Sequence, residues 1–107
     1  MRNIALNAVF SSLVLPAGVT RASAGEAASV VIADLDFKPS VVTVRIGDTV
    51  TWTNKDFVEH TATSRDGAFD IATPTSKPAH WRAQKPGDFA YYCRLHPNMT
   101  GTIRVMR

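Results

Sequence analysis

The sequence predicts an all-β fold, arranged as an antiparallel sandwich or barrel with Greek-key connections. From residue 25 onward, no segment shows a convincing apolar period of 3.6 residues. Short runs instead alternate between apolar and polar residues, and turn-forming residues separate one run from the next. Short strands that recur with turns between them are typical of this fold class.

Three strands are predicted in the first half of this region. Residues 30–32 form a brief apolar strand whose facing is ambiguous, and residues 41–46 alternate as a half-buried strand does. Residues 49–54 are rich in the β-branched and aromatic residues that strands prefer. This third strand places three side chains on one inward face: Val50, Trp52 and Asn54.

The second half is predicted to contain a return strand, a loop and three more strands. The return strand begins at His60, close to where the preceding strand ends, and residues 64–78 form a loop with Pro and Gly breakers. Residues 79–83 form another strand, and a turn at residues 85–88 follows it. The last two strands have inward faces formed by Phe89, Tyr91 and Cys93 in one and by Ile103 and Val105 in the other.

The N-terminal segment is predicted to be an export signal. A positively charged start precedes an apolar stretch over residues 4–19, and Ala22-Ser23-Ala24 has the small-x-small form of a signal-peptidase site. Polar residues and Pro16 interrupt the stretch, which is too short for a membrane-spanning helix. We therefore expect a signal peptide over residues 1–24, one domain over residues 25–107 and a periplasmic location.

Charge and cysteine content narrow the possible functions. The formal net charge is +3, and the basic residues are spread along the chain, so no cluster indicates nucleic-acid binding. The chain has a single Cys, which cannot form an internal disulfide. An unpaired thiol in an exported protein requires an explanation, and metal ligation provides one.

The segment Cys93-Arg94-Leu95-His96-Pro97-Asn98-Met99 places a thiolate, an imidazole and a thioether on one short loop. A copper ion that alternates between Cu(I) and Cu(II) is bound by one Cys, two His and a weak, long axial Met. The loop supplies three of these four donors, so a second histidine must come from elsewhere. His60 is the candidate by its location, whereas His80 lies on the outward face of its strand and is expected to be a surface residue.

The residues of this loop also allow other interpretations. Cys93 could be a small buried hydrophobic residue in a hairpin. An exported copper-handling protein is the main alternative function, although such proteins favour open Met-rich or His-rich sites and this chain has three Met including Met1. An enzyme with Cys93 as nucleophile and His96 as base is less consistent, because such pairs usually meet through the fold.

Several motifs together resemble the small blue (type 1) copper proteins of the cupredoxin family, and are similar to those of amicyanins, plastocyanins and pseudoazurins. The motifs are Phe37-Lys38-Pro39, Gly47-Asp48, Trp52-Thr53-Asn54, His60-Thr61 and Cys93-x-x-His96-Pro97-x-Met99-x-Gly101. The resemblance implies a Greek-key β-sandwich of about seven to eight strands. It also implies one copper ion, with His60, Cys93 and His96 as strong ligands and Met99 as the axial ligand.

The resemblance further implies an electron carrier and not an enzyme. Redox proteins such as a c-type cytochrome and a dehydrogenase or other electron donor would dock transiently near His96, and the protein would be a monomer without stable membrane insertion. Apolar residues would surround the exposed edge of that imidazole: Leu95, Pro97 and either Phe57 or Ile71. Leu95 and Asn98 stand where amicyanins have Pro and an aromatic residue, so the particular partner of amicyanin is not carried over. Asn54 is expected to connect the loop before His60 with the backbone beside Cys93.

Overall fold

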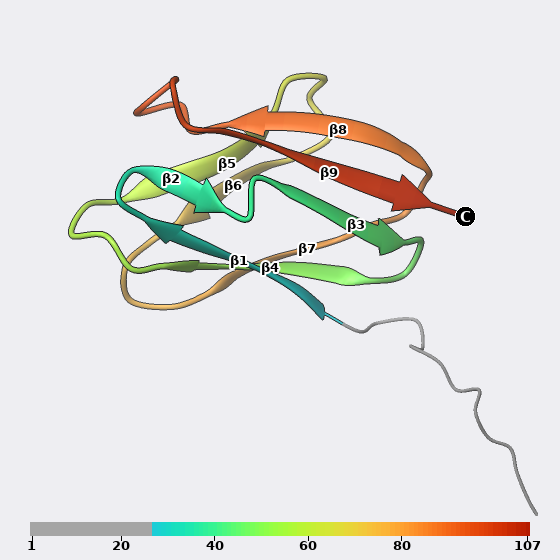
Figure 1. Cartoon of the computed structure of the whole chain (residues 1–107), viewed down its shortest axis with the longest axis horizontal. Coiled ribbons are helices and arrows are strands. Elements are labelled where there is room, and N and C mark those ends of the chain that lie inside the picture. The colour runs from blue at the N-terminus through green and yellow to red at the C-terminus, as the bar shows by residue number, and fades with distance from the viewer. Residues whose placement is uncertain (1–26) are drawn as a thin grey trace, which may run out of the picture.

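The computed structural model describes residues 27–107, and the predicted signal peptide, residues 1–24, lies outside the described residues. Within residues 27–107, the chain forms nine strands and no helix (Figure 1). The strands form two sheets that pack face to face, with the strand orders β2-β1-β4-β7 and β3-β9-β8-β5-β6. This part of the chain therefore has no helix long and apolar enough to cross a membrane.

The observed strands confirm the predicted all-β sandwich, although there are nine of them where about seven to eight were expected. The four-stranded sheet contains β1 (Ala27–Ala33), β2 (Asp36–Lys38), β4 (Thr49–Asn54) and β7 (Ala79–Arg82). The five-stranded sheet contains β3 (Val41–Arg45), β5 (His60–Ser64), β6 (Asp70–Thr73), β8 (Gly87–Tyr92) and β9 (Thr100–Met106).

Two strand pairs correct the expectation of a purely antiparallel arrangement. β1 runs parallel to β4, and β3 runs parallel to β9. Between β1 and β4 the chain crosses to the other sheet to form β3, so the two neighbours start from the same end. A hairpin turn cannot produce such a pair, and parallel neighbours need a longer crossover connection.

The predicted inward faces are confirmed in β4, β8 and β9. Side chains on these faces are buried in the core between the sheets: Val50, Trp52 and Asn54 in β4, Phe89 and Tyr91 in β8 with Cys93 just beyond it, and Ile103 and Val105 in β9. Because side chains alternate along a strand, these rows face the opposite sheet and meet in one core.

The two strands absent from the sequence prediction are β2 and β6. Both lie at an edge of their sheet, and each buries only one side chain, Phe37 in β2 and Thr73 in β6. β6 falls within residues 64–78, which were predicted as a loop, so that prediction is wrong for residues 70–73. A strand with a single inward residue shows no alternating pattern in the sequence. It can be recognised only from the strand that it pairs with in the fold.

The centre of the core is an aromatic pair in which Tyr91 lies against Trp52. The ring centroids are 5.7 Å apart, and Trp52 Nε1 donates a hydrogen bond of 3.2 Å to Tyr91 Oη. Burial raises the pKa of Tyr91 to about 12, so its hydroxyl stays protonated at neutral pH. Tyr91 also lies directly over its cross-strand partner Gly101, where a Cβ atom would be 2.6 Å from Tyr91 Cζ. Only glycine fits beneath this ring.

We expect Tyr91→Phe to lower the free energy of unfolding by about 1–3 kcal/mol, because the buried Trp52 Nε1 would lose its acceptor. Denaturant titration of the variant and the unmodified protein measures this difference. Tyr92→Phe is the matched control, since Tyr92 is only half-buried. Equal stability losses in the two variants would contradict the importance of the hydrogen bond.

Candidate metal centre

The three strong-donor residues predicted from the sequence lie at one end of the sandwich. His60 is the first residue of β5, Cys93 directly follows β8, and His96 lies in the loop between β8 and β9 (Figure 1). β5 and β8 pair antiparallel with Thr63 opposite Tyr92, so the beginning of β5 lies beside the residues that follow β8. His60 and Cys93 are buried, whereas His96 is half-buried.

The donor atoms of these residues converge on one point. Cys93 Sγ lies 3.6 Å from His60 Nδ1 and 3.9 Å from His96 Nδ1. All three donor atoms lie within 4.8 Å of one another. The two imidazole rings have centroids 4.9 Å apart and an interplanar angle of 65°.

These distances fit a single metal ion. Metal bonds of about 2.0 Å to imidazole nitrogen and about 2.3 Å to thiolate sulfur put two ligands of one ion roughly 3.5–3.9 Å apart. The observed separations of 3.6 and 3.9 Å between sulfur and nitrogen fall in this range. A thiolate with two imidazoles is the donor set that type 1 copper prefers, so the residues present fit a copper ion.

Backbone hydrogen bonds shape the loop that carries Cys93, His96 and Met99. The N–H of Cys93 donates to the carbonyl of Met99 at 3.1 Å, and the N–H of Met99 donates to the carbonyl of His96 at 2.9 Å. The N–H of His96 in turn donates to the carbonyl of Cys93 at 3.3 Å. The three residues therefore hold one another in a closed turn.

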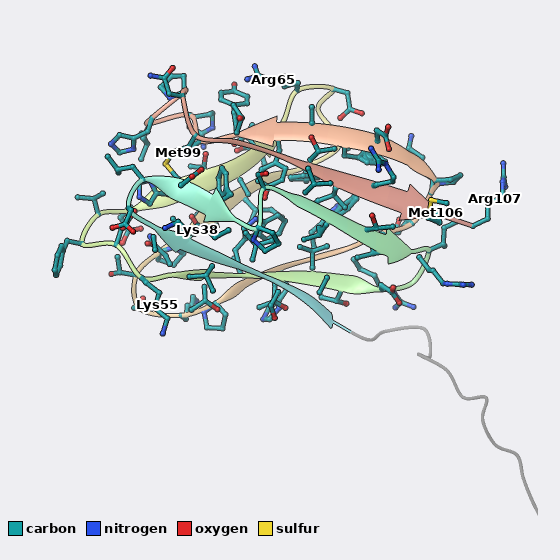
Figure 2. The ribbon with its side chains drawn as sticks, viewed as in Figure 1. Lys38, Lys55, Arg65, Met99, Met106 and Arg107 are labelled. Carbon is teal, nitrogen blue, oxygen red and sulfur yellow. The ribbon has the colours of Figure 1, made fainter. Side chains whose placement is uncertain are left out.

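Met99, the predicted axial residue, is 2 % exposed and packs in the core cluster. Figure 2 shows its side chain at the end of the sandwich where the loop from Cys93 lies, far from Met106 at the other end. Because a thioether is a weak donor on a flexible side chain, its burial at this end restricts where the sulfur can go.

Thr61 joins the two chain segments that carry the donors. Its N–H donates to Cys93 Sγ at 3.4 Å, and its hydroxyl accepts the N–H of Arg94 at 2.9 Å. These two bonds hold the sulfur and the residue that follows it against the start of β5. This role of Thr61 could not be predicted from the sequence, since only the fold brings β5 beside the residue that follows β8.

Asn54 forms only part of the bridge that was expected of it. Its amide nitrogen donates to the carbonyl of Val58 at 2.9 Å, so it does hold the loop before His60. The same nitrogen donates to the carbonyl of Thr73 at 2.8 Å and not to the backbone beside Cys93. The expected connection to Cys93 is wrong because β6, a strand that the sequence did not reveal, occupies the position next to Asn54.

Asp56 is the second residue that sequence analysis missed. Its carboxylate accepts hydrogen bonds from the N–H groups of Asp34 and Leu35 and lies 2.9 Å from His60 Nε2. Desolvation raises the pKa of Asp56, but these hydrogen bonds outweigh it and leave the pKa below its usual value. The ionised carboxylate accepts the proton of Nε2, which leaves His60 Nδ1 free to face Cys93.

Apolar side chains surround the exposed edge of His96. Leu95 is 55 % exposed, and a surface pocket beside it is lined by Leu35, Leu95, His96, Pro97, Asn98 and Met99. Leu35 was not predicted here, because the turn that presents it belongs to the unrecognised hairpin of β1 and β2. Phe57 is fully exposed, whereas Ile71 packs against the core.

His80, the competing histidine, lies exposed on β7. Its Nδ1 is 2.9 Å from the hydroxyl of Thr51 on the neighbouring strand β4. Its position agrees with the expectation of a surface residue.

Comparisons with known proteins agree with this geometry. The family described as Cupredoxin-like domain matches residues 4–105. Amicyanin-alpha of Methylorubrum extorquens is 32 % identical over 111 residues, which cover 94 % of this chain and 92 % of that protein.

Solved structures share the fold. A Cu(I) mutant of amicyanin superposes with a TM-score of 0.69 at 24 % identity, covering 75 % of this chain and 82 % of that one. Amicyanin from Paracoccus versutus gives a TM-score of 0.66 at 24 % identity, covering 75 % of this chain and 81 % of that one. Since the family match spans most of the sequence and the curated relative is similar over nearly its whole length, the chain belongs to the cupredoxin family of small blue copper proteins.

Proposed function

We propose that this protein is a type 1 blue copper electron-transfer protein that shuttles single electrons between redox partners outside the cytoplasm. One observation carries the proposal: the buried sulfur of Cys93 lies 3.6 and 3.9 Å from the Nδ1 atoms of His60 and His96, and the three donors form a triangle whose corners all lie within 4.8 Å of one another. Membership of the cupredoxin family supports it, as does the Cu(I) named for one amicyanin structure of the same fold.

In this proposal His60, Cys93 and His96 are the strong ligands of copper and Met99 is the weak axial ligand. Bound copper would supply reversible one-electron oxidation and reduction. The chain holds the ligands in place and keeps water away from them. Cys93, His60 and Met99 are almost fully buried, and backbone hydrogen bonds hold the loop closed. Ligands that are already held in place move little when the charge at the site changes, which favours fast electron transfer.

The same geometry favours a carrier over an enzyme or a copper-handling protein. Four protein donors leave no open position for a substrate. Cys93 is 0 % exposed, so its sulfur is poorly placed to act as a nucleophile toward an external substrate. A protein that hands copper over needs donors accessible to the recipient, whereas only His96 among these residues reaches the surface.

We define the docking face as Leu35, Leu95, His96 and Pro97. Redox proteins such as a c-type cytochrome and an electron-donating dehydrogenase would contact this face briefly, and electrons would pass through the imidazole edge of His96. Small apolar contact areas suit complexes that must dissociate quickly. The export signal expected over residues 1–24 supports a periplasmic location for this exchange.

We expect Cys93→Ser to abolish the intense visible absorption of the copper-loaded, oxidised protein, because the sulfur-to-copper charge transfer needs the thiolate. Visible spectroscopy of both proteins after copper loading measures the effect, and circular dichroism checks that the fold is retained. His80→Gln is the control and should keep the full band. A colourless wild-type protein after copper loading would contradict the proposed function.

We expect Met99→Leu to keep the blue colour while making the copper easier to reduce, because the weak axial donor tunes the reduction potential. A tenfold change in relative stability of the two oxidation states corresponds to a rise of about 59 mV for one electron. Cyclic voltammetry provides the measurement. Loss of copper binding in this variant would show that the axial assignment is mistaken.

We expect Leu95→Asp to slow electron self-exchange between reduced and oxidised copies by about tenfold or more, because two like charges would face each other where the docking faces meet. NMR line broadening in mixtures of the two forms measures this rate without knowledge of the natural partner. Met106→Asp is the matched control, since Met106 has a similar exposure of 51 % at the opposite end (Figure 2). Equal slowing in both variants would argue against docking near His96.

A further inference from the structure

The carboxylate of Asp56 connects His60 to a separate part of the chain. Asp56 Oδ2 lies 2.9 Å from His60 Nε2, and the side chains of these residues are 15 % and 0 % exposed. The same carboxylate accepts the N–H of Asp34 at 2.8 Å on Oδ1 and the N–H of Leu35 at 3.0 Å on Oδ2. Three donors from two segments therefore converge on one side chain.

The turn that Asp56 holds has an unusual backbone. Asp34 and Leu35 are the two residues between β1 and β2, and both have positive φ angles, 55° and 58°. Two-residue hairpins of this type favour Asn-Gly or Asp-Gly, because a side chain such as that of Leu is strained at positive φ. The two hydrogen bonds that the N–H groups of Asp34 and Leu35 donate to the Asp56 carboxylate oppose this strain.

The turn matters for the surface of the protein because Leu35 belongs to the docking face. Its side chain is 53 % exposed and lines the same pocket as Leu95 and His96. A residue that fixes this turn therefore also fixes one contact of any partner that docks there.

We propose that Asp56 is a positioning residue that holds the His60 imidazole and the Asp34-Leu35 turn as one unit. Its charge favours the oxidised ion at His60, and its hydrogen bonds place Leu35 on the docking face. The redox part of this inference rests on the proposed function, whereas the positional part applies equally to the metal-free chain.

The test compares Asp56→Asn with Asp34→Asn. Both substitutions remove one negative charge and lie in the same small region, but the carboxylate of Asp34 accepts from Lys38 Nζ at 3.0 Å and has no bond to His60. In Asp56→Asn the amide NH₂ must face at least one N–H donor, because all three partners of this carboxylate are donors.

In copper-loaded protein, we expect Asp56→Asn to weaken Cu(II) binding about tenfold relative to Cu(I), in line with the effect of removing such supporting groups. This corresponds to a rise in reduction potential of about 59 mV, measured by cyclic voltammetry. In metal-free protein, hydrogen exchange of the Asp34 and Leu35 amides should accelerate tenfold or more, and ¹⁵N NMR should show that His60 no longer keeps its proton on Nε2. Asp34→Asn should leave the His60 tautomer unchanged and shift the potential much less.

The proposal would be overturned if the two variants showed the same exchange rates for the Asp34 and Leu35 amides and the same His60 tautomer. These metal-free measurements separate it from the proposed function, which fails if the wild-type protein gives no blue copper form. If Asp56→Asn does not fold, the wild-type chain still decides: exchange of the Asp34 and Leu35 amides at the rate of free peptide, or a His60 proton on Nδ1, would overturn the proposal.

Discussion

The contact between β5 and the residue after β8 is the constraint on which the site depends. Thr61 donates its N–H to Cys93 Sγ and accepts the N–H of Arg94, so one residue fixes a segment 32 positions away in the chain. With this contact in place, His60 stands beside Cys93 because it precedes Thr61. The closed turn from Cys93 to Met99 then brings His96 beside both the sulfur and the His60 ring.

The strands that could be predicted are those whose alternation is long enough to show. β4 and β8 each carry at least two large inward residues, and their faces follow from a period of two. β2 and β6 each bury one residue, and the parallel pairs join strands distant in sequence, so neither follows from a local pattern. The spacing of Cys93, His96 and Met99 shows in the sequence because all three lie on one turn.

The residues that support the site could not be predicted in the same way. Thr61 and Asp56 act through hydrogen bonds to backbone N–H groups, which every residue type except proline offers, so no particular residue type in the sequence indicates these bonds. Leu35 reaches the surface beside His96 only because a two-residue hairpin turns there. The side chains that bind a metal can be identified from the sequence. The identity of the groups that orient them depends on which backbone segments become neighbours in the fold.

The close approach of Tyr91 to Gly101 restricts how this protein can change over evolutionary time. Any side chain at position 101 would overlap the Tyr91 ring, so replacement of the glycine becomes tolerable only after position 91 has become smaller. A smaller residue at position 91 in turn leaves the indole N–H of Trp52 without its acceptor. Positions 52, 91 and 101 are therefore coupled: a substitution at any one of them alone leads first to a less stable protein.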